Sequence, residues 1–224
     1  EDKFSEYPSL IYDGPFSDNV IEGKPKGLDG ENLSLEKAKE KARKFVGEDK
    51  AGKIIETSSG KGKIHTYGLE VSPKDKDKGN PVNIDITKKG GYVLWMLNPR
   101  DIPEKKLTDW QASDKAKKFL KEQGFGELTE TYFLKNDNTT TITFIGISKD
   151  GVLIYPDLIK VKVALDNGEI VGLDAYQYLM SHRKRDIPKP RLTEEEARKK
   201  VSERIKVERV KLAIIPMPGD KEQL

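Results

Sequence analysis

A pattern of six residues occurs twice in this chain at a fixed distance, and this repeat constrains the fold more than any other feature. Arg100-Asp101-Ile102-Pro103 is followed after three residues by Leu107-Thr108, and Arg185-Asp186-Ile187-Pro188 is followed after three residues by Leu192-Thr193. The two copies lie 85 residues apart (185 minus 100). A fixed period of this length is typical of a chain built from repeated structural units. We therefore expect tandem modules, and arrays of such modules commonly bind other molecules.

Each copy of the pattern leads into a stretch with helical periodicity, and a third such stretch lies nearer the N-terminus. Ser34, Thr108 and Thr193 each precede apolar residues at helical spacing, which is typical of a helix with one buried face. A Ser or Thr hydroxyl can cap the free N–H groups of a first turn, and an acidic residue follows each of these three closely. We therefore predict three helices, the third of them over residues 193–206.

Apolar segments follow the first two helices and predict antiparallel strands. The predicted strands are residues 54–55, 64–71, 82–86 and 92–97 and, after the second helix, 130–134, 139–147, 159–165 and 169–180. Asp166-Asn167-Gly168 and Gly90-Gly91 predict hairpin turns, because Asn and Gly adopt positive φ readily. The predicted fold class is therefore α+β, with tandem repeats that each pack one helix on an antiparallel sheet of about four strands.

This periodicity divides the chain into a leader and three units. The leader is residues 1–30, the first repeat is 31–104, the second is 105–189, and an incomplete third repeat is 190–224. The third unit offers one predicted strand after its helix, residues 209–215, which leaves an exposed sheet edge. The natural protein could continue beyond Leu224, its end could have been trimmed, or a partner could supply the missing surface. We expect a longer natural protein, since the chain also begins with Glu1 rather than Met.

The leader carries aromatic residues in a context that disfavours regular structure. Tyr7, Tyr12 and Phe16 are interspersed with Pro8, Pro15 and a glycine, so this segment is neither a helix nor a central strand. We expect the leader to run extended over the first units with its aromatic rings docked on them.

Composition and motifs argue against catalysis, cofactors and nucleic acid. The 41 basic and 38 acidic residues are interspersed, so no basic stripe suggests nucleic-acid binding. The chain has no cysteine, and its two histidines, His65 and His182, lie in different repeats, so the sequence predicts no metal site. No nucleotide-binding loop or nucleophile motif occurs, and no run approaches the roughly 20 apolar residues of a membrane-spanning helix. We therefore predict a protein that is not an enzyme and binds no cofactor.

Two strands are candidates for contacts with a partner or between repeats. Residues 92–97, which include Trp95, are all apolar, so we expect both faces of that strand to be covered. The last predicted strand of the second repeat carries Tyr176 and Tyr178 and should behave similarly. The second face could meet a neighbouring repeat, the N-terminal segment or a partner.

The duplicated linkers are the other contact candidates. Pro103 restrains Ile102 to extended geometry, Ile102 can fill the gap between units, and Arg100 and Asp101 can hydrogen-bond across the join. Arg185, Asp186 and Ile187 would do the same at the second join. The complete set of contact candidates is Tyr7, Tyr12, Phe16, Trp95, Arg100, Asp101, Ile102, Tyr176, Tyr178, Arg185, Asp186 and Ile187.

The leader, residues 7–18, reads Tyr-Pro-Ser-Leu-Ile-Tyr-Asp-Gly-Pro-Phe-Ser-Asp and closely resembles the YpeB family of spore germination proteins of Bacillus-type bacteria. The helix-plus-sheet repeats resemble PepSY domains, and Asp166-Asn167-Gly168-Glu169-Ile170 is similar to the strand–turn–strand ending of that domain family. The resemblance covers essentially the whole chain. It implies two complete PepSY units and a third that this chain cuts short.

The resemblance also implies a function. It implies a non-enzymatic spore protein, extracytoplasmic and associated with the inner spore membrane and cortex through an N-terminal region outside this chain. It implies a partner, the cortex-lytic enzyme SleB, which the protein would bind, stabilise and restrain until germination. The family offers no catalytic residues to carry over to this sequence.

Two other roles stay open at this point. The repeats could act as a structural tether or chaperone for the lytic enzyme without inhibiting it, or they could bind peptidoglycan directly. An exposed sheet edge in the third unit would also permit a homodimer.

Overall fold

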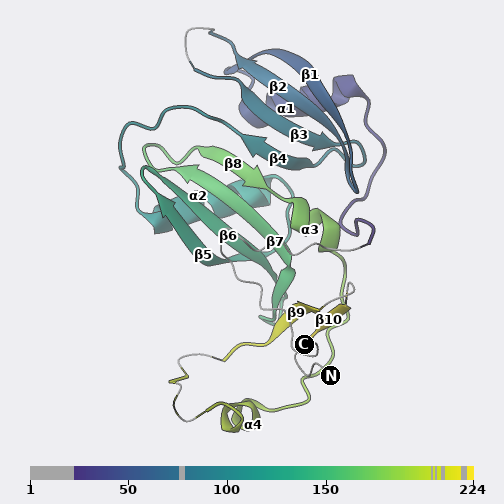
Figure 1. Ribbon diagram of the computed structural model, residues 1–224, viewed down its shortest axis with the longest axis vertical. Helices are drawn as coiled ribbons and strands as arrows, with labels where there is room; N and C mark the ends of the chain where they lie inside the picture. Colours follow the sequence, from purple (N-terminus) through teal and green to yellow (C-terminus); the bar gives the residue numbers. More distant parts are fainter. Residues whose placement is uncertain (1–22, 76–78, 203, 205, 208–209, 218–220) are drawn as a thin grey trace, which may run out of the picture.

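Eight strands of the two repeats form one continuous antiparallel sheet (Figure 1). The structure is a computed structural model that describes residues 23–75, 79–202, 204, 206–207, 210–217 and 221–224. The strand order is β1-β2-β3-β4-β8-β7-β6-β5. The strands are β1 (Ala51–Lys61), β2 (His65–Pro73), β3 (Val82–Thr87), β4 (Val93–Leu97), β5 (Leu128–Asn136), β6 (Thr139–Ile147), β7 (Leu153–Ala164) and β8 (Ile170–Asp174). The predicted α+β fold class is therefore confirmed.

The two repeats meet edge to edge in the middle of this sheet. Each contributes a meander of four neighbouring strands, and the last strand of one, β4, pairs antiparallel with the last strand of the other, β8. The paired residues are Trp95 with Asp174, Met96 with Leu173, and Leu97 with Gly172. Because these hydrogen bonds join the two edge strands, the repeats share one continuous sheet and are not separate domains.

Helices α1 (Leu35–Val46) and α2 (Asp109–Glu122) cover one face of the sheet, as Figure 1 shows. Thr108 forms a capping box with Gln111, as its hydroxyl accepts from the Gln111 amide at 3.2 Å and its own amide donates to Gln111 Oε1 at 2.9 Å. Ala38, Ala42, Ala112 and Ala116 are fully buried, so both helices lie close to the strands. The rings of Phe45 and Phe119 meet edge to face, with centroids 5.4 Å apart, and join the two helices.

The predicted strand over residues 169–180 is wrong in its second half. Strand β8 ends at Asp174, and Tyr176–Ser181 form the short helix α3. Ala175 leaves the extended region at φ −110° and ψ 11°, and the Tyr176 amide donates to Asp174 Oδ1 at 3.0 Å, which turns the chain. Periodicity alone does not distinguish a short apolar strand from a buried helical turn. Here the segment is helical because its apolar side chains pack against β7 and β4.

The third unit also differs from its prediction. Helix α4 (Glu194–Lys199) stops well short of residue 206, and none of its residues is buried. A short helix with no buried face gains little from packing, which accounts for its length. The following strand β9 (Ala213–Met217) begins later than predicted and joins the second repeat, where it runs parallel to β7. A second strand, β10 (Lys221–Gln223), pairs antiparallel with β9.

The expectation that both faces of residues 92–97 are covered is wrong as well. Val93, Leu94 and Met96 are buried on β4, but Trp95 is 38% exposed and Leu97 is 36% exposed. These two side chains project from the face of the sheet opposite the helices. Among the described residues, no helix is both long and apolar enough to cross a membrane.

Candidate interaction face and repeat junctions

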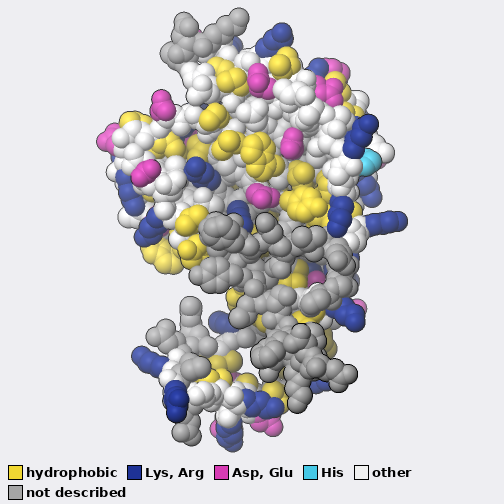
Figure 2. All heavy atoms as spheres, in the orientation of Figure 1, with side chains coloured by type: hydrophobic (Ala, Val, Ile, Leu, Met, Phe, Trp, Pro, Cys, Tyr) yellow, Lys and Arg dark blue, Asp and Glu magenta, His cyan; other side chains and the backbone are white. Residues whose placement is uncertain are grey.

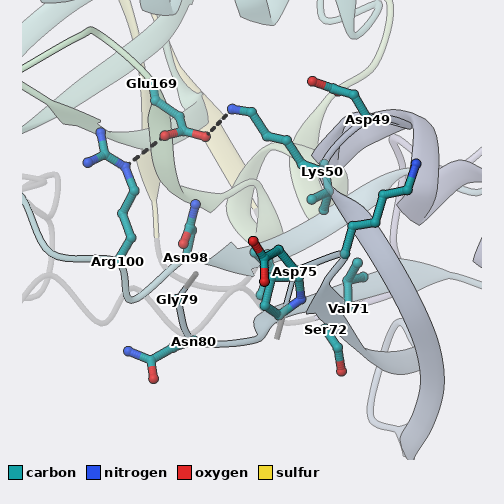
Figure 3. A pocket seen from close by; sticks show the side chains of 14 residues that line it. Asp49, Lys50, Val71, Ser72, Asp75, Gly79, Asn80, Asn98, Arg100 and Glu169 are labelled. Atoms are coloured by element: carbon teal, nitrogen blue, oxygen red, sulfur yellow. Dashed lines mark hydrogen bonds and ion pairs between the residues drawn. The ribbon is translucent and has the colours of Figure 1, made fainter. Parts of the chain in front are cut away.

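Arg100 joins the first repeat to the hairpin of the second. Its Nη1 and Nη2 donate to the two carboxylate oxygens of Asp166 at 2.8 and 2.7 Å, and Nη2 also donates to Asn167 Oδ1 at 2.9 Å. Its Nε lies 2.7 Å from Glu169 Oε2 in an ion pair, and Lys50 reaches the other oxygen of Glu169 at 2.8 Å (Figure 3). Two parallel bonds between a guanidinium and a carboxylate fix orientation as well as distance. The hydrogen bond from Arg100 lowers the pKa of Asp166 below its usual value.

A cavity of about 520 Å³ lies beside this junction, between the end of α1 and the second repeat (Figure 3). Val46, Val71 and Val82 line its apolar part, and Asn80 and Asn98 are among its polar residues. A smaller cavity of about 220 Å³ adjoins it and is lined by both rings of the contact between α1 and α2. Within the described ranges, no group of three or more His, Asp or Glu side chains could hold a metal ion. The cavity therefore has an apolar part and a polar rim, and its described lining holds no metal-binding cluster.

Arg185, the equivalent residue in the second copy of the pattern, makes a different and more deeply buried junction. Its Nη2 and Nη1 donate to Asp157 Oδ1 and Oδ2 at 2.8 and 3.1 Å, and its Nε and Nη2 donate to Glu222 at 3.0 and 2.9 Å. His182 Nδ1 lies 2.6 Å from Asp157 Oδ2. The side chains of Arg185 and Asp157 are only 6% and 2% exposed. This network ties β7, the end of α3 and β10 together.

A break in the register of β7 creates the place for Asp157. Ile145 of β6 pairs with Leu158, but the next residue, Gly146, pairs with Ile154, so residues 155–157 bulge out of the ladder. A Cβ on Gly146 would lie 3.0 Å from Asp157 Cβ and 3.2 Å from Ile154 Cβ, so the glycine leaves the necessary room. Sequence reasoning missed Asp157, although one signal was available: it is the single acid in a predominantly apolar segment, residues 152–165.

The two tyrosines predicted to share one strand have different positions. Tyr176 is 39% exposed at the start of α3, whereas Tyr178 is only 5% exposed. The Tyr178 ring stacks on His182 with centroids 4.3 Å apart, and its hydroxyl accepts from the Gly126 amide at 3.1 Å. Burial raises the pKa of Tyr178. Tyr178 is therefore part of the packing of the second repeat, and only Tyr176 is available to a partner.

The other linker candidates contribute less. Asp101 and Asp186 are exposed, and Ile102 and Ile187 are partly buried. The carbonyl of Asp101 accepts from Arg100 at 2.9 Å, and the carbonyl of Ile102 accepts from Asn138 Nδ2 at 2.8 Å. The leader candidates Tyr7, Tyr12 and Phe16 lie outside the described residues.

The helix-free face of the sheet carries a set of exposed apolar side chains. Cross-strand pairing places them in two rows that run across the strands, and Figure 2, which views this face, shows hydrophobic side chains with carboxylates among them over the middle of the sheet. The set comprises Ile55, Trp95, Leu97, Tyr132 and Leu134, each between 36% and 41% exposed. We call these five residues and their cross-strand neighbours the open face. Polar side chains, among them Glu70 and Lys162, lie between these five residues in the rows. A surface that mixes apolar and polar side chains in this way is typical of a non-obligate contact site.

Comparison with known proteins places this architecture in a family. Residues 1–188 match the family model described as YpeB sporulation, PepSY1 and PepSY2 domains. The sporulation protein YpeB of Bacillus subtilis (strain 168) is 37% identical over 193 residues, which are 84% of this chain and 42% of that protein. YpeB of Halalkalibacterium halodurans is 33% identical over 190 residues, 85% of this chain and 42% of that protein. This chain thus spans less than half the length of these curated relatives.

A solved structure agrees with the sequence matches. The Bacillus megaterium YpeB C-terminal domain has a TM-score of 0.77 and 36% sequence identity, over 86% of this chain and 85% of that chain. The helix-on-sheet repeats described above are accordingly of the PepSY type. With a family model that covers most of the chain and relatives above 30% identity, this chain belongs to the YpeB family of sporulation proteins.

Proposed function

We propose that this chain is a non-enzymatic germination regulator that binds, stabilises and restrains a cortex-lytic peptidoglycan hydrolase of the SleB type in the dormant spore. Membership of a sporulation family supports the spore context. The proposed location is extracytoplasmic, at the inner spore membrane and cortex, with membrane attachment only through an N-terminal region outside this chain. The proposed partner follows from the family resemblance of the leader and repeats.

The open face is the observation that carries a binding function. It presents five large apolar side chains on a broad sheet made rigid by the β4–β8 join and backed by two helices. A rigid, partly apolar surface binds a protein with little loss of its own conformational entropy. Restraint would then result from steric occlusion of the hydrolase cleft by this platform.

Several carboxylates of the described residues are held in ion pairs. The carboxylates whose pKa is lowered, such as Asp166 and Glu130, lie in ion pairs with Arg100 and Lys117. Asp157, the most deeply buried carboxylate of the junctions, is occupied on both oxygens by Arg185. Groups paired in this way stabilise the fold and are unsuited to act as a general acid or base.

A titration of this chain into purified SleB-type hydrolase tests the proposal. Binding is followed by calorimetry and cortex lysis is measured in parallel, and we expect binding together with loss of lysis. Leu134→Glu on the open face should weaken binding by about tenfold or more, while Leu192→Glu, of similar exposure but in a linker, should not. Binding without loss of lysis would show a tether, and absence of binding would exclude this region as the contact.

Two further measurements address the alternative partners. Sedimentation of this chain with purified cortex in the absence of hydrolase reports direct peptidoglycan binding. Analytical ultracentrifugation over a range of concentrations reports a homodimer, which stays a prediction.

A further inference from the structure

Trp95 lies between two carboxylates on the open face. Its cross-strand partner on β3 is Asp85 and its partner on β8 is Asp174, so an Asp–Trp–Asp row crosses three adjacent strands. Side chains at such paired positions have Cβ atoms about 4.5–5.5 Å apart and touch one another. The indole ring is 38% exposed, so the centre of the row is accessible from solvent.

The two carboxylates of this row have one lysine as a cross-strand neighbour and no ion pair among the described residues. In the part of the chain that the structure describes, no ion pair involves Asp85 or Asp174, even though Lys160 is the cross-strand partner of Asp174 on β7. Asp174 Oδ1 accepts only a backbone bond from the amide of Tyr176. Asp85 is partly buried, and this burial raises its pKa. A carboxylate withdrawn from water without a cation is unfavourable, so a cation from outside would stabilise it.

The row of the open face that contains Leu97 is mixed, with Asn83 beside it on β3 and Lys162 two strands away on β7. Leu97 is two residues from Trp95 on β4, and its partner on β8 is Gly172, which has no side chain to cover it. A Cβ on Gly172 would lie 2.9 Å from Lys162 Cβ and 3.7 Å from its Cδ, so the aliphatic stem of Lys162 lies over this glycine. Leu97 and the aliphatic stem of Lys162 therefore form a small apolar surface beside the row of Trp95.

We propose that the open face docks a protein segment that places an Arg or Lys side chain over Trp95, between Asp85 and Asp174, and an apolar side chain on Leu97. A cation above an indole ring is held by the ring quadrupole, and two flanking carboxylates add charge complementarity. This inference goes beyond the proposed function, because it concerns the chemistry that the face recognises, whichever protein presents it.

A protein segment fits this surface better than a glycan. Leu97, the exposed residue next to Trp95 on this face of β4, is aliphatic and offers no hydrogen bond to a sugar hydroxyl. Carboxylates on a peptidoglycan strand would lie near Asp85 and Asp174, and like charges repel one another. An extended peptide with alternating basic and apolar residues could instead satisfy both rows at once.

Fluorescence of a single tryptophan tests the proposal. Trp110, the only other tryptophan, is 66% exposed on α2, so Trp110→Phe leaves Trp95 as the reporter. The probe is an acetylated and amidated peptide of alternating Leu and Arg, and its control replaces each Arg with Glu. We expect the Arg peptide alone to change the Trp95 emission, with an affinity that falls as salt rises.

Matched variants separate this site from general electrostatic attraction. Asp85→Asn with Asp174→Asn in the same background should weaken the Arg peptide by about tenfold, whereas Asp101→Asn with Asp186→Asn should leave its affinity unchanged. Circular dichroism confirms that each variant is folded. The proposal is overturned if Trp95 does not respond to the Arg peptide, if both peptides bind equally, or if the Asp85 and Asp174 variant binds as well as its control. A response to tetra-N-acetylglucosamine without one to the Arg peptide would overturn it in favour of a glycan.

Discussion

Arg100 and Arg185 occupy the same place in a repeated sequence, yet they hold the second repeat near opposite ends of β7 and in different environments. Arg100 reaches forward by 66 positions to a hairpin, with side chains 21% and 14% exposed. Arg185 reaches back by 28 positions to a bulge, with side chains 6% and 2% exposed. Each pair is bidentate, so the local chemistry is conserved between the copies while its surroundings are not. The burial of an ion pair, more than its geometry, determines how much its loss destabilises the fold.

Removal of the buried arginine should have the largest effect. Arg185→Ala leaves the Asp157 carboxylate buried without its cation, and we expect the free energy of unfolding to fall by about 3–5 kcal/mol. Urea denaturation measures this difference. A loss no larger than that of Arg100→Ala would show that burial does not distinguish the two junctions.

Removal of both Arg185 and Asp157 tests whether the unpaired charge causes this loss of stability. Arg185→Leu combined with Asp157→Leu eliminates the two most deeply buried charges, and Glu222 keeps Arg183 at 2.8 Å, so the double variant should recover most of the stability lost in Arg185→Ala. Denaturation of the double variant beside both single variants gives the coupling energy. If the double variant is as unstable as the sum of the single variants, the ion pair is not the cause of the effect.

The less deeply buried junction, that of Arg100 with Asp166, should be less sensitive to loss of its arginine. Arg100→Ala should reduce the free energy of unfolding by about 1–2 kcal/mol, since water and salt partly replace the lost pair. Its clearer effect should be a wider distribution of the angle between repeats, because Arg100 joins the first repeat to the hairpin of the second. Small-angle scattering of this variant and of the wild type tests that expectation, and identical profiles would contradict it.

Acid should weaken the first junction selectively. The pKa of Asp166 is lowered from 3.8 by its hydrogen bond with Arg100, so its stabilising contribution is complete above that value and is lost as the pH falls through the lower folded-state pKa. Wild type should be more stable than Asp166→Asn at neutral pH, and the two should converge from about pH 4 downward. Thermal melting across this pH range measures the convergence, and a constant gap would argue against the pair.

The exposed acids of the two linkers should matter least. Asp101→Ala and Asp186→Ala remove surface carboxylates and should change the free energy of unfolding by no more than about 0.5 kcal/mol. Urea denaturation with the same protocol provides the comparison. A large effect for either residue would mean that the repeated sequence has a role besides the arginine contacts.

Local signals in the sequence were sufficient for helices α1 and α2, for the start of α4 and for most strands. Thr108 is followed by Gln111, and these two residues form the capping box that starts α2. Gly90 and Gly91 both adopt positive φ, at 74° and 67°, in the predicted turn between β3 and β4. Such features depend on neighbours along the chain, so they can be recognised without knowledge of the fold.

Contacts between distant residues could not be predicted in the same way. The sequence indicates that Arg100 and Arg185 are equivalent, but nothing in it indicates that one would meet Asp166 and the other Asp157. The open face could not be predicted from the sequence either, because Asp85, Trp95 and Asp174 become neighbours only through the registers of β3, β4 and β8.

The sequence by itself therefore determined the repeated α+β units, their helix caps and their turns, because these depend on periodicity and local hydrogen bonding. Tertiary structure alone decided that the repeats join through β4 and β8, that residues 176–181 become a helix, and that Trp95 faces solvent. Those outcomes depend on which surface each apolar side chain finds to bury against, and that is a property of the whole packed sheet.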